Sequence, residues 1–364
     1  MKILIGMLVH NEEDVISNTL SSLFKQDIFT SNQFEVEIIV LANGCWDKTV
    51  AVAKSNLANF ALKNPILYKV IDKEEPGKIA AWNDLVHQHS NGDEKYIIFM
   101  DGDIIIQEPN NLSTLVESLE NNSKALISTD QPIKDIALEK SKSLRSKLSC
   151  SFSKITQKGS SQLCGQLYCA RADFIRKIFI PPEILIDDTY LKFMACTGGL
   201  KHPVDHEKIV NNYHISHIFE AYTGFQDYFN NQIRQAAGFS LWRIFKEIIK
   251  QDLSYSDAIE IVNQKRLQDP FWLKKAMYHY FTNGKKKWFI YQGALGVRFK
   301  RLKRLNLLGK LKMLIPTCLA WFIDLAVFIM ANQKIKNQHL EDLWPDTKSK
   351  KLAALSRPLT NIQN

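Results

Sequence analysis

Several signatures of nucleotide and metal chemistry are absent from this 364-residue sequence, and each absence removes a class of function. Neither a GxxxxGKS/T loop nor a GxGxxG fingerprint occurs, which disfavours a P-loop NTPase and a dinucleotide-dependent dehydrogenase. The six cysteines form no CxxC pair and show no metal-ligand spacing. We therefore interpret them as buried, reduced thiols of a cytosolic protein.

An export signal is also missing. The apolar stretch in MKILIGMLVHNEE is short, has no small-residue cleavage site and runs directly into acidic residues. We interpret residues 2–9 as a buried strand and expect the main body of the protein to lie in the cytoplasm. With 15 glycines, 11 prolines and 45% hydrophobic residues, the composition is that of an ordinary globular protein.

Acidic residues are missing from positions 297–313, where seven lysines and arginines make the chain strongly basic. The mostly apolar run 313–331 follows at once, but Pro316 and Asp324 interrupt it, and its 19 residues are marginal for a membrane span. A basic segment beside an apolar helix is typical of attachment to the anionic inner leaflet, by one span or by an embedded helix. The alternative is a buried core helix with a solvated basic face.

The net charge of +9 does not indicate a nucleic-acid partner. A nucleic-acid groove combines basic residues with stacking aromatics along its length, whereas the basic residues here adjoin an apolar helix. We expect an anionic membrane surface as the partner and no nucleic acid.

A strand, a loop and a helix repeat three times in the first hundred residues. Apolar runs at 2–9, 36–42 and 66–72 are each followed by apolar residues at helical spacing, and a fourth run ends at Asp101. This repeat predicts an α/β fold with a mainly parallel sheet flanked by helices, a Rossmann-like arrangement. Ligands of such sheets bind at the carboxyl ends of the strands. The polar residues at these ends are His10, Asn11, Glu12, Asn43, Gly44, Asp101, Gly102 and Asp103.

The fourth strand ends in two acids separated by one glycine, Asp101-Gly102-Asp103. Two carboxylates this close do not both stay ionised readily without a counter-charge, which a divalent cation supplies. Hard oxygen ligands suit Mg²⁺ or Mn²⁺ shared with substrate phosphates, and a glycine lets backbone and ligand approach closely. Many acid-x-acid triplets are plain turns, so the position at the end of this strand is what favours a metal site.

Four segments, in this order and spacing, resemble the family 2 inverting glycosyltransferases, which have the GT-A fold: HNEEDVISNTLSSL, VEIIVLANGCWDKT, EEPGKIAAWN and IIFMDGDIII. The resemblance covers residues 1–240. It implies a nucleotide-binding half at 1–110 and an acceptor half at 111–240. Three regions are expected to follow: a helical basic region at 241–312, an apolar membrane-associated or single-span helix at 313–331 and a polar tail at 332–364.

In that family the ends of the first two strands hold the nucleobase and the ribose. The resemblance implies this role for His10, Asn11, Glu12 and Asn43. The family often has an aspartate where this chain has Asn43, whose amide can still bond a pyrimidine edge; a plain turn at Asn43 is the alternative. Lys78 matches a lysine near the donor pocket, and its alternative is a surface position at a helix N-terminus.

The acid-x-acid motif and a second acidic pair complete the implied apparatus. Asp103 would bind the metal directly, and Asp101 would contact the ribose or a metal-bound water. Asp187-Asp188 resembles the family's Glu-Asp motif, whose second acid deprotonates the acceptor hydroxyl as that hydroxyl attacks the anomeric carbon in line. Asp188 is the expected base and Asp187 the second choice. From the residues alone, two acids that open a helix are also favourable capping residues.

Residues 213–238 resemble the region where related enzymes place a histidine and then an arginine-bearing helix. His217 or His214 would complete the metal or diphosphate site, and Arg234 would hold a phosphate. A structural pair of histidines is the alternative. Processive synthases carry a Q/R-x-x-R-W motif near here, and QIRQAAG lacks the tryptophan.

The resemblance therefore implies an inverting, non-processive glycosyltransferase. It would use Mn²⁺ or Mg²⁺ and move one sugar from a nucleotide-diphosphate sugar, with a UDP-sugar preferred, to a hydroxyl of a lipid-linked or polysaccharide acceptor. We expect it at the cytoplasmic face of the cell membrane. A processive polysaccharide synthase and a non-catalytic scaffold that binds sugar nucleotides are the alternatives.

Overall fold

The computed structural model describes residues 1–137, 162–221, 224–251, 257–283, 287–291, 293–303 and 306–337. The polar segment 139–161, interpreted from its sequence as a loop, lies outside the described residues. So do Cys150 and most of the predicted tail at 332–364. The five described cysteines are all free; two are buried and three are half-buried.

The first four strands form the parallel part of one sheet. In the first, second and fourth of them nearly every side chain is buried, because helices cover both faces of the sheet there, whereas the third strand, at the sheet edge, has only exposed and half-buried residues. The strands pair in parallel in the order β3-β2-β1-β4, and this parallel pairing confirms the prediction from the sequence. They are β1 (Lys2–Val9), β2 (Glu35–Asn43), β3 (Leu67–Lys73) and β4 (Tyr96–Asp101).

Four later strands extend the sheet from β4 in the order β7-β6-β8-β5, and here the pairing is mixed. β7 runs antiparallel to both β4 and β6, β6 and β8 are parallel, and β5 is antiparallel to β8. The chain leaves β4 at Asp101 and forms β5 at the far edge of the sheet. The strands are β5 (Ile104–Ile106), β6 (Ile127–Lys134), β7 (Leu167–Arg171) and β8 (Ile209–Phe219).

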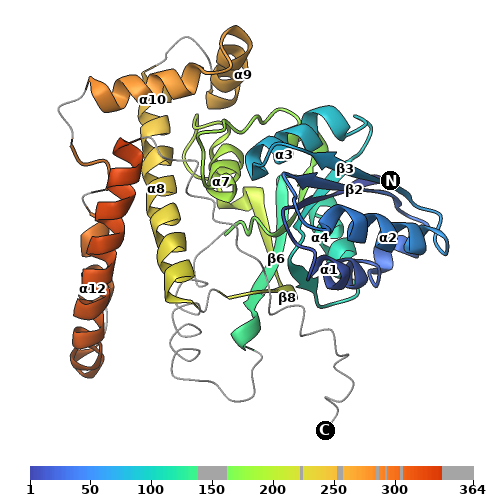
Figure 1. Ribbon diagram of the computed structural model, residues 1–364, viewed down its shortest axis with the longest axis horizontal. Helices are drawn as coiled ribbons and strands as arrows, with labels where there is room; N and C mark the ends of the chain where they lie inside the picture. Colours follow the sequence, from blue (N-terminus) through green and yellow to red (C-terminus); the bar gives the residue numbers. More distant parts are fainter. Residues whose placement is uncertain are drawn as a thin grey trace.

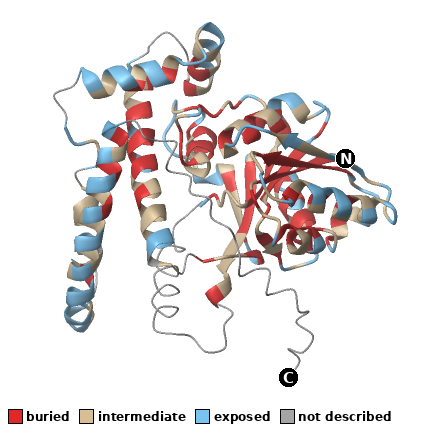
Figure 2. Ribbon diagram, viewed as in Figure 1, coloured by how far each residue is buried: buried red, intermediate tan, exposed pale blue. Residues whose placement is uncertain are grey.

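Two hydrophobic cores lie on opposite faces of the sheet, because alternate residues of each strand point to opposite sides. Ile3 and Ile5 of β1 pack toward α1, α2 and α4, whereas Leu4 and Leu8 pack toward α3, α7 and α8 (Figure 1). Figure 2 shows that the central strands are almost entirely buried. The helices are α1 (Ile16–Leu23), α2 (Thr49–Ala61), α3 (Lys78–Asp84) with a π-helical turn at Leu85–His89, α4 (Asn111–Glu120), α6 (Ala172–Ile175) and α7 (Asp187–Thr197). Short 3-10 turns lie at Asp27–Phe29, Asp135–Ala137, His206–Lys208 and Ala294–Gly296.

The C-terminal part is helical, as predicted, and its two long helices lie side by side on the side of the molecule away from the sheet (Figure 1). The boundary predicted at residue 240 falls inside the first of them, and the apolar run 313–331 lies within the second. The domain boundaries beyond these facts stay predictions. The helices are α8 (Phe225–Lys250), α9 (Ala258–Gln268), α10 (Trp272–Thr282), α11 (Val297–Lys303) and α12 (Leu307–Lys336).

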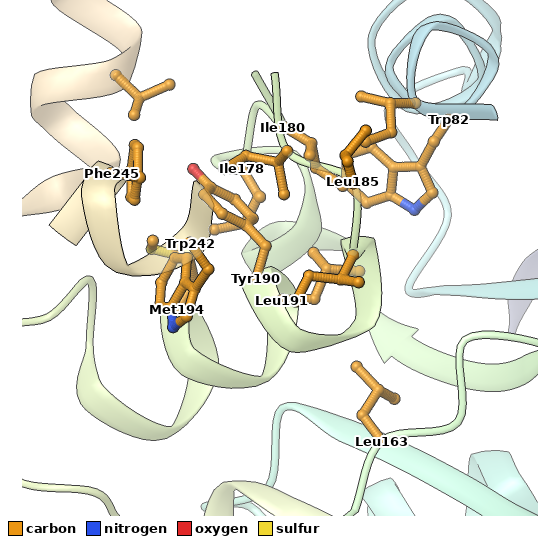
Figure 3. Close-up of a cluster of buried hydrophobic side chains, with 14 of the residues drawn as sticks. Trp82, Leu163, Ile178, Ile180, Leu185, Tyr190, Leu191, Met194, Trp242 and Phe245 are labelled. Carbon is orange, nitrogen blue, oxygen red and sulfur yellow. The ribbon is translucent and has the colours of Figure 1, made fainter. Parts of the chain in front are cut away.

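Aromatic packing fixes α7, the helix that begins with the two predicted catalytic acids (Figure 3). The ring of Tyr190 lies edge-on to that of Trp242 of α8 at a centroid distance of 5.9 Å, and its hydroxyl donates to the carbonyl of Phe179 at 3.0 Å. Tyr190 and Trp242 are both almost fully buried. The start of α7 is therefore held at a defined place against α8 and the segment that contains Phe179.

Candidate active site

The ends of β1 and β2 are tied together by backbone and side-chain hydrogen bonds. Asn11 adopts a left-handed conformation with φ of +55°, which asparagine tolerates better than most residues. Its side-chain oxygen accepts from the backbone N–H of Trp46 at 3.0 Å, and the His10 ring nitrogen Nδ1 lies 2.6 Å from the carbonyl oxygen of Asn43. The predicted nucleotide-binding residues at the ends of the two strands are therefore connected to one another by hydrogen bonds.

The side chain of Asn43 bridges two backbone segments. Its Nδ2 donates to the carbonyl of Val9 at 2.9 Å, and its Oδ1 accepts from the N–H of Gly77 at 3.0 Å. An aspartate could accept from Gly77 but could not donate to Val9, so a carboxylate at this position would lose one of the two hydrogen bonds. A contact between Asn43 and a nucleobase stays a prediction.

Lys78 connects the acids of two different elements. Its Nζ lies 2.8 Å from Asp101 Oδ1 of β4 and 3.9 Å from Asp187 Oδ2 of α7. Burial opposes the charge on Lys78, but the two carboxylates outweigh it and hold the lysine pKa above its ordinary value. Burial raises the pKa of Asp101 to about 6; Lys78 opposes this shift and Asp103 adds to it. The structure thus brings together residues that lie far apart in the sequence.

Asp188 is placed as a weakly basic carboxylate. Burial, followed by the neighbouring charge of Asp187, raises its pKa to about 6. The backbone N–H of Thr189 donates to Asp188 Oδ1 at 2.6 Å and fixes the carboxylate. A side chain at Gly165 would bring its Cβ within 3.3 Å of the Asp188 Cβ, so the glycine leaves room beside the acid. Such a carboxylate is mostly ionised at neutral pH and can still accept a proton.

Glu12 carries an unsatisfied oxygen at the same strand end. Its Oε2 is buried and has no hydrogen-bond partner, although its backbone N–H donates to Thr49 Oγ1 at 2.7 Å. Burial, with repulsion from Asp103 and Asp101, raises the pKa of Glu12 to about 10. A buried polar atom without a partner is unusual and marks a place where a ligand group can bind.

The two histidines of β8 differ sharply in environment, as the alternation of a strand requires. His214 is exposed, whereas the buried His217 places Nδ1 at 2.8 Å from Asp130 Oδ1 and Nε2 at 3.4 Å from Gln166 Oε1. Burial opposes protonation of His217, but Asp130 outweighs it and raises the histidine pKa to about 10. A register shift between Thr129 and Gln131 of β6 lies at Asp130. A metal-binding role for His217 stays a prediction.

Sequence reasoning missed Asp130 and Gln166. The only sequence signal is an acid within a strand in one case and a glutamine before a strand in the other, and neither is specific. Arg234 bonds along its own helix, with Nη2 at 3.1 Å from Asn231 Oδ1, and its contact with phosphate stays a prediction. Among the described residues, no three His, Cys, Asp or Glu side chains are grouped closely enough to hold a metal ion by themselves.

Comparison with known proteins identifies the family. Residues 4–176 match the model of the family described as glycosyl transferase family 2. The chain carries a family 2 glycosyltransferase domain. This domain therefore has the family and enzyme class that its motifs predict. No curated protein sequence matches the chain.

Solved structures add a fold comparison. A mannosyltransferase from Pyrobaculum calidifontis in complex with GDP-Man and Mn²⁺ shares 15% identity, with a TM-score of 0.53 over 92% of this chain and 86% of that one. Staphylococcus aureus TarS 1–349 with UDP gives 14% identity and a TM-score of 0.44 over 94% and 92%. Glucosyl-3-phosphoglycerate synthase from Mycobacterium tuberculosis with Mn²⁺ and UDP shares 17% identity, with a TM-score of 0.42 over 66% of this chain and 77% of that one. The first comparison supports the GT-A fold of the glycosyltransferase, as predicted.

Proposed function

We propose that the protein transfers one sugar from a nucleotide-diphosphate sugar to an acceptor hydroxyl with inversion at the anomeric carbon. The observation that carries this proposal is the convergence of Lys78, Asp101 and the Asp187-Asp188 pair from α3, β4 and α7. These side chains lie where the carboxyl ends of the parallel strands meet, which is the ligand-binding edge of such sheets.

Asp188 acts as the general base in this proposal. The acceptor hydroxyl gives its proton to the Asp188 carboxylate, and its oxygen forms a bond to the anomeric carbon as the bond to the nucleoside diphosphate breaks on the opposite face. The hydrogen bond from Thr189 fixes the carboxylate. Asp187 is turned toward Lys78, which favours Asp188 as the base.

The donor nucleotide occupies the connected edge of β1 and β2. His10, Asn11 and Glu12 face the nucleoside in this proposal, and the unsatisfied Oε2 of Glu12 offers an acceptor to a ribose hydroxyl. Lys78 moves from Asp101 toward the diphosphate when the donor binds, because the phosphates carry more charge than one carboxylate.

The carboxylates at the end of β4 fit a divalent cation. Burial first, and then repulsion from Asp103, raises the pKa values of Asp101 and Glu12, and a cation relieves that repulsion. Too few side chains of the part of the chain that the structure describes converge for a complete metal cage, which suits Mg²⁺ or Mn²⁺ sharing its shell with substrate phosphates. Asp103 and Asp101 would hold the ion, which supplies charge neutralisation of the departing diphosphate.

We keep a UDP-sugar as the first donor to test and a GDP-sugar as the second. The mannosyltransferase and TarS structures contain GDP-Man and UDP respectively. For the acceptor we propose a lipid-linked or polysaccharide precursor at the cytoplasmic face of the membrane, because the basic α11 adjoins the apolar α12.

Thermal unfolding with UDP, GDP, dTDP and CMP, each with and without Mn²⁺, tests the donor site. A nucleotide at a hundredfold excess over its Kd should stabilise the protein by about 2.7 kcal/mol. The Asp103→Asn variant should lose the manganese-dependent part of that shift. No shift with any nucleotide in well-folded protein would contradict the donor site.

The base is tested separately. Asp188→Asn should keep nucleotide binding and lose transfer by about 10²–10⁴-fold, the usual contribution of a general base. Asp187→Asn is the matched control and should lose less. Equal losses in the two variants would contradict the assignment of Asp188, and long products from the wild-type protein would favour the processive alternative.

A further inference from the structure

α12 has two chemically distinct faces. Among the described residues it is the one helix long and apolar enough to cross a membrane. One face is turned to solvent and carries large apolar side chains that are between 63% and 71% exposed. We call these residues the outer stripe, and they recur at intervals of three and four: Leu308, Leu311, Ile315, Leu319 and Phe322.

The opposite face belongs to the core of the glycosyltransferase domain. Val327, Ala331 and Ile335 are at most 3% exposed and lie in the same contiguous hydrophobic cluster as Tyr190 of α7 and Trp242 of α8. Asn332 ties this end down further, because its Oδ1 accepts from the backbone N–H of Phe289 at 2.7 Å. A membrane span over 313–331 would have to pull Val327 and Ala331 out of that core.

Asp324 gives a second argument against a span. It forms a bidentate ion pair with Arg298 of α11, in which Arg298 Nη2 lies 2.8 Å from Asp324 Oδ1 and Arg298 Nε contacts Asp324 Oδ2. Asp324 is two residues past the middle of the run 313–331, which corresponds to about 3 Å along a helix. If that run crossed a bilayer, α11 with the exposed Lys300 and Lys303 would enter the hydrocarbon, where ammonium groups are strongly disfavoured.

The charges around the outer stripe indicate what covers it. At 100° per residue, Lys312 and Lys336 lie within about 60° of the angular centre of the stripe, one near each end of α12. Both are exposed, as are Lys300 and Lys303 of α11. Figure 2 shows the exposed side of α12 away from α8. An apolar stripe flanked by lysines matches the interface of an anionic lipid leaflet, where lysines reach phosphates while apolar side chains enter the acyl region.

We propose that α12 lies in the plane of an anionic phospholipid surface, with its outer stripe in the lipid and its inner face on α8, and does not cross the bilayer. This inference deepens the membrane location in the proposed function and rests on it. The Arg298–Asp324 pair is its internal support, because it neutralises the one acid of the apolar run on the side away from lipid.

The topology is tested with the full chain in sealed inverted vesicles, which expose the cytoplasmic leaflet. Lysines are labelled with a membrane-impermeant amine reagent and mapped by mass spectrometry. The expected result is that Lys312 and Lys336 are labelled to similar extents, with no gain after permeabilisation. If either lysine is protected until the vesicles are opened, α12 spans the membrane and the proposal is overturned. If the protein is absent from the membrane fraction, α12 does not contact lipid and the proposal is overturned as well.

The outer stripe is tested by flotation of purified protein with phosphatidylcholine vesicles that contain or lack phosphatidylglycerol. Leu311→Glu/Phe322→Glu should weaken binding to the phosphatidylglycerol vesicles by at least about tenfold. Leu267→Glu on α9, at a site 72% exposed, is the matched control and should bind like wild type. Similar unfolding midpoints of the three proteins would show that folding is intact.

Unchanged vesicle binding by the double variant would overturn the proposal. The proposal would also be overturned if the double variant lost self-association and kept vesicle binding, because a second copy of the chain would then cover the stripe. Manganese-dependent nucleotide binding, measured on the same samples, reports on the glycosyltransferase site independently. A failure of the membrane inference is thereby distinguished from a failure of the proposed function.

Discussion

Replacing Asp187 with asparagine should move the acid limb of the transfer reaction to lower pH. The pKa of Asp188 is about 6 because of burial first and the charge of Asp187 second. In the wild-type protein the base is half ionised near pH 6, so at pH 5 the rate should fall to roughly a tenth of its plateau. Asp187→Asn removes the neighbouring charge, lowers the pKa of Asp188 and should retain a larger fraction of its own plateau at pH 5.

A second variant separates Asp188 from Asp101, whose pKa is also about 6 and is also raised by Asp187. The hydroxyl of Thr189 bonds the Asp188 carboxylate and lowers its pKa. Thr189→Val removes that bond, so it should raise the pKa of Asp188 and move the acid limb to higher pH. Thr189 is not among the groups that shift Asp101.

The assay is single-turnover transfer at saturating donor across the acid range, with each variant normalised to its own plateau. Opposite displacements of the limb by Asp187→Asn and Thr189→Val are expected. A limb that moves with Asp187→Asn and not with Thr189→Val would assign the titration to Asp101. A limb that moves with neither would refute the reasoning from burial and charge.

Three further substitutions test the packing and electrostatics around the site. Glu12→Gln should stabilise the metal-free protein by up to about 3 kcal/mol at pH 7. The raised pKa of Glu12 means that the wild-type protein must take up a proton when it folds above pH 4.5, which costs stability, whereas glutamine is already neutral. Urea denaturation should show that the gain disappears toward pH 4. Gly6→Ala would place a Cβ 2.0 Å from Leu85 Cδ2 and should destabilise the protein by about 1–3 kcal/mol. Urea denaturation should show that the double variant Gly6→Ala/Leu85→Val recovers part of this loss. Arg298→Ala leaves Asp324 without its partner and should cost about 1–2 kcal/mol of unfolding free energy, part of which Asp324→Ala in the same chain should restore.

The parallel half of the sheet could be predicted from the sequence because its signals are local. β1 and β2 are largely apolar runs that end in polar residues and are followed by residues with helical spacing, and β4 is a third apolar run, which ends at Asp101. The parallel topology then brings these ends together, so the location of His10, Asn43 and Asp101 at one edge follows from the pattern alone.

The far half of the sheet could not be predicted in the same way. Ile106 pairs with His217, and no local pattern indicates a partner more than a hundred residues away. The environment of His217 depends on this pairing and on the register shift at Asp130, so its buried ion pair could be found only in the folded structure. The apolar run 313–331 is a related case, because composition does not tell which face of α12 packs on α8.

The helix that begins with the proposed catalytic pair and the helix with the outer stripe contact the same element, α8. A Cβ at Gly238 of α8 would lie 2.8 Å from Ile186 Cγ2, directly before Asp187, while α12 packs along α8 through Val327 and Ala331. Close packing transmits position with little give, so a membrane-bound α12 sets the height of Asp188 above the lipid. The double variant of the outer stripe should therefore slow transfer to a lipid-linked acceptor in vesicles and leave transfer to a water-soluble analogue of that acceptor unchanged. Equal slowing with both acceptors would show that the stripe acts on the fold of the active site and not on access to the membrane.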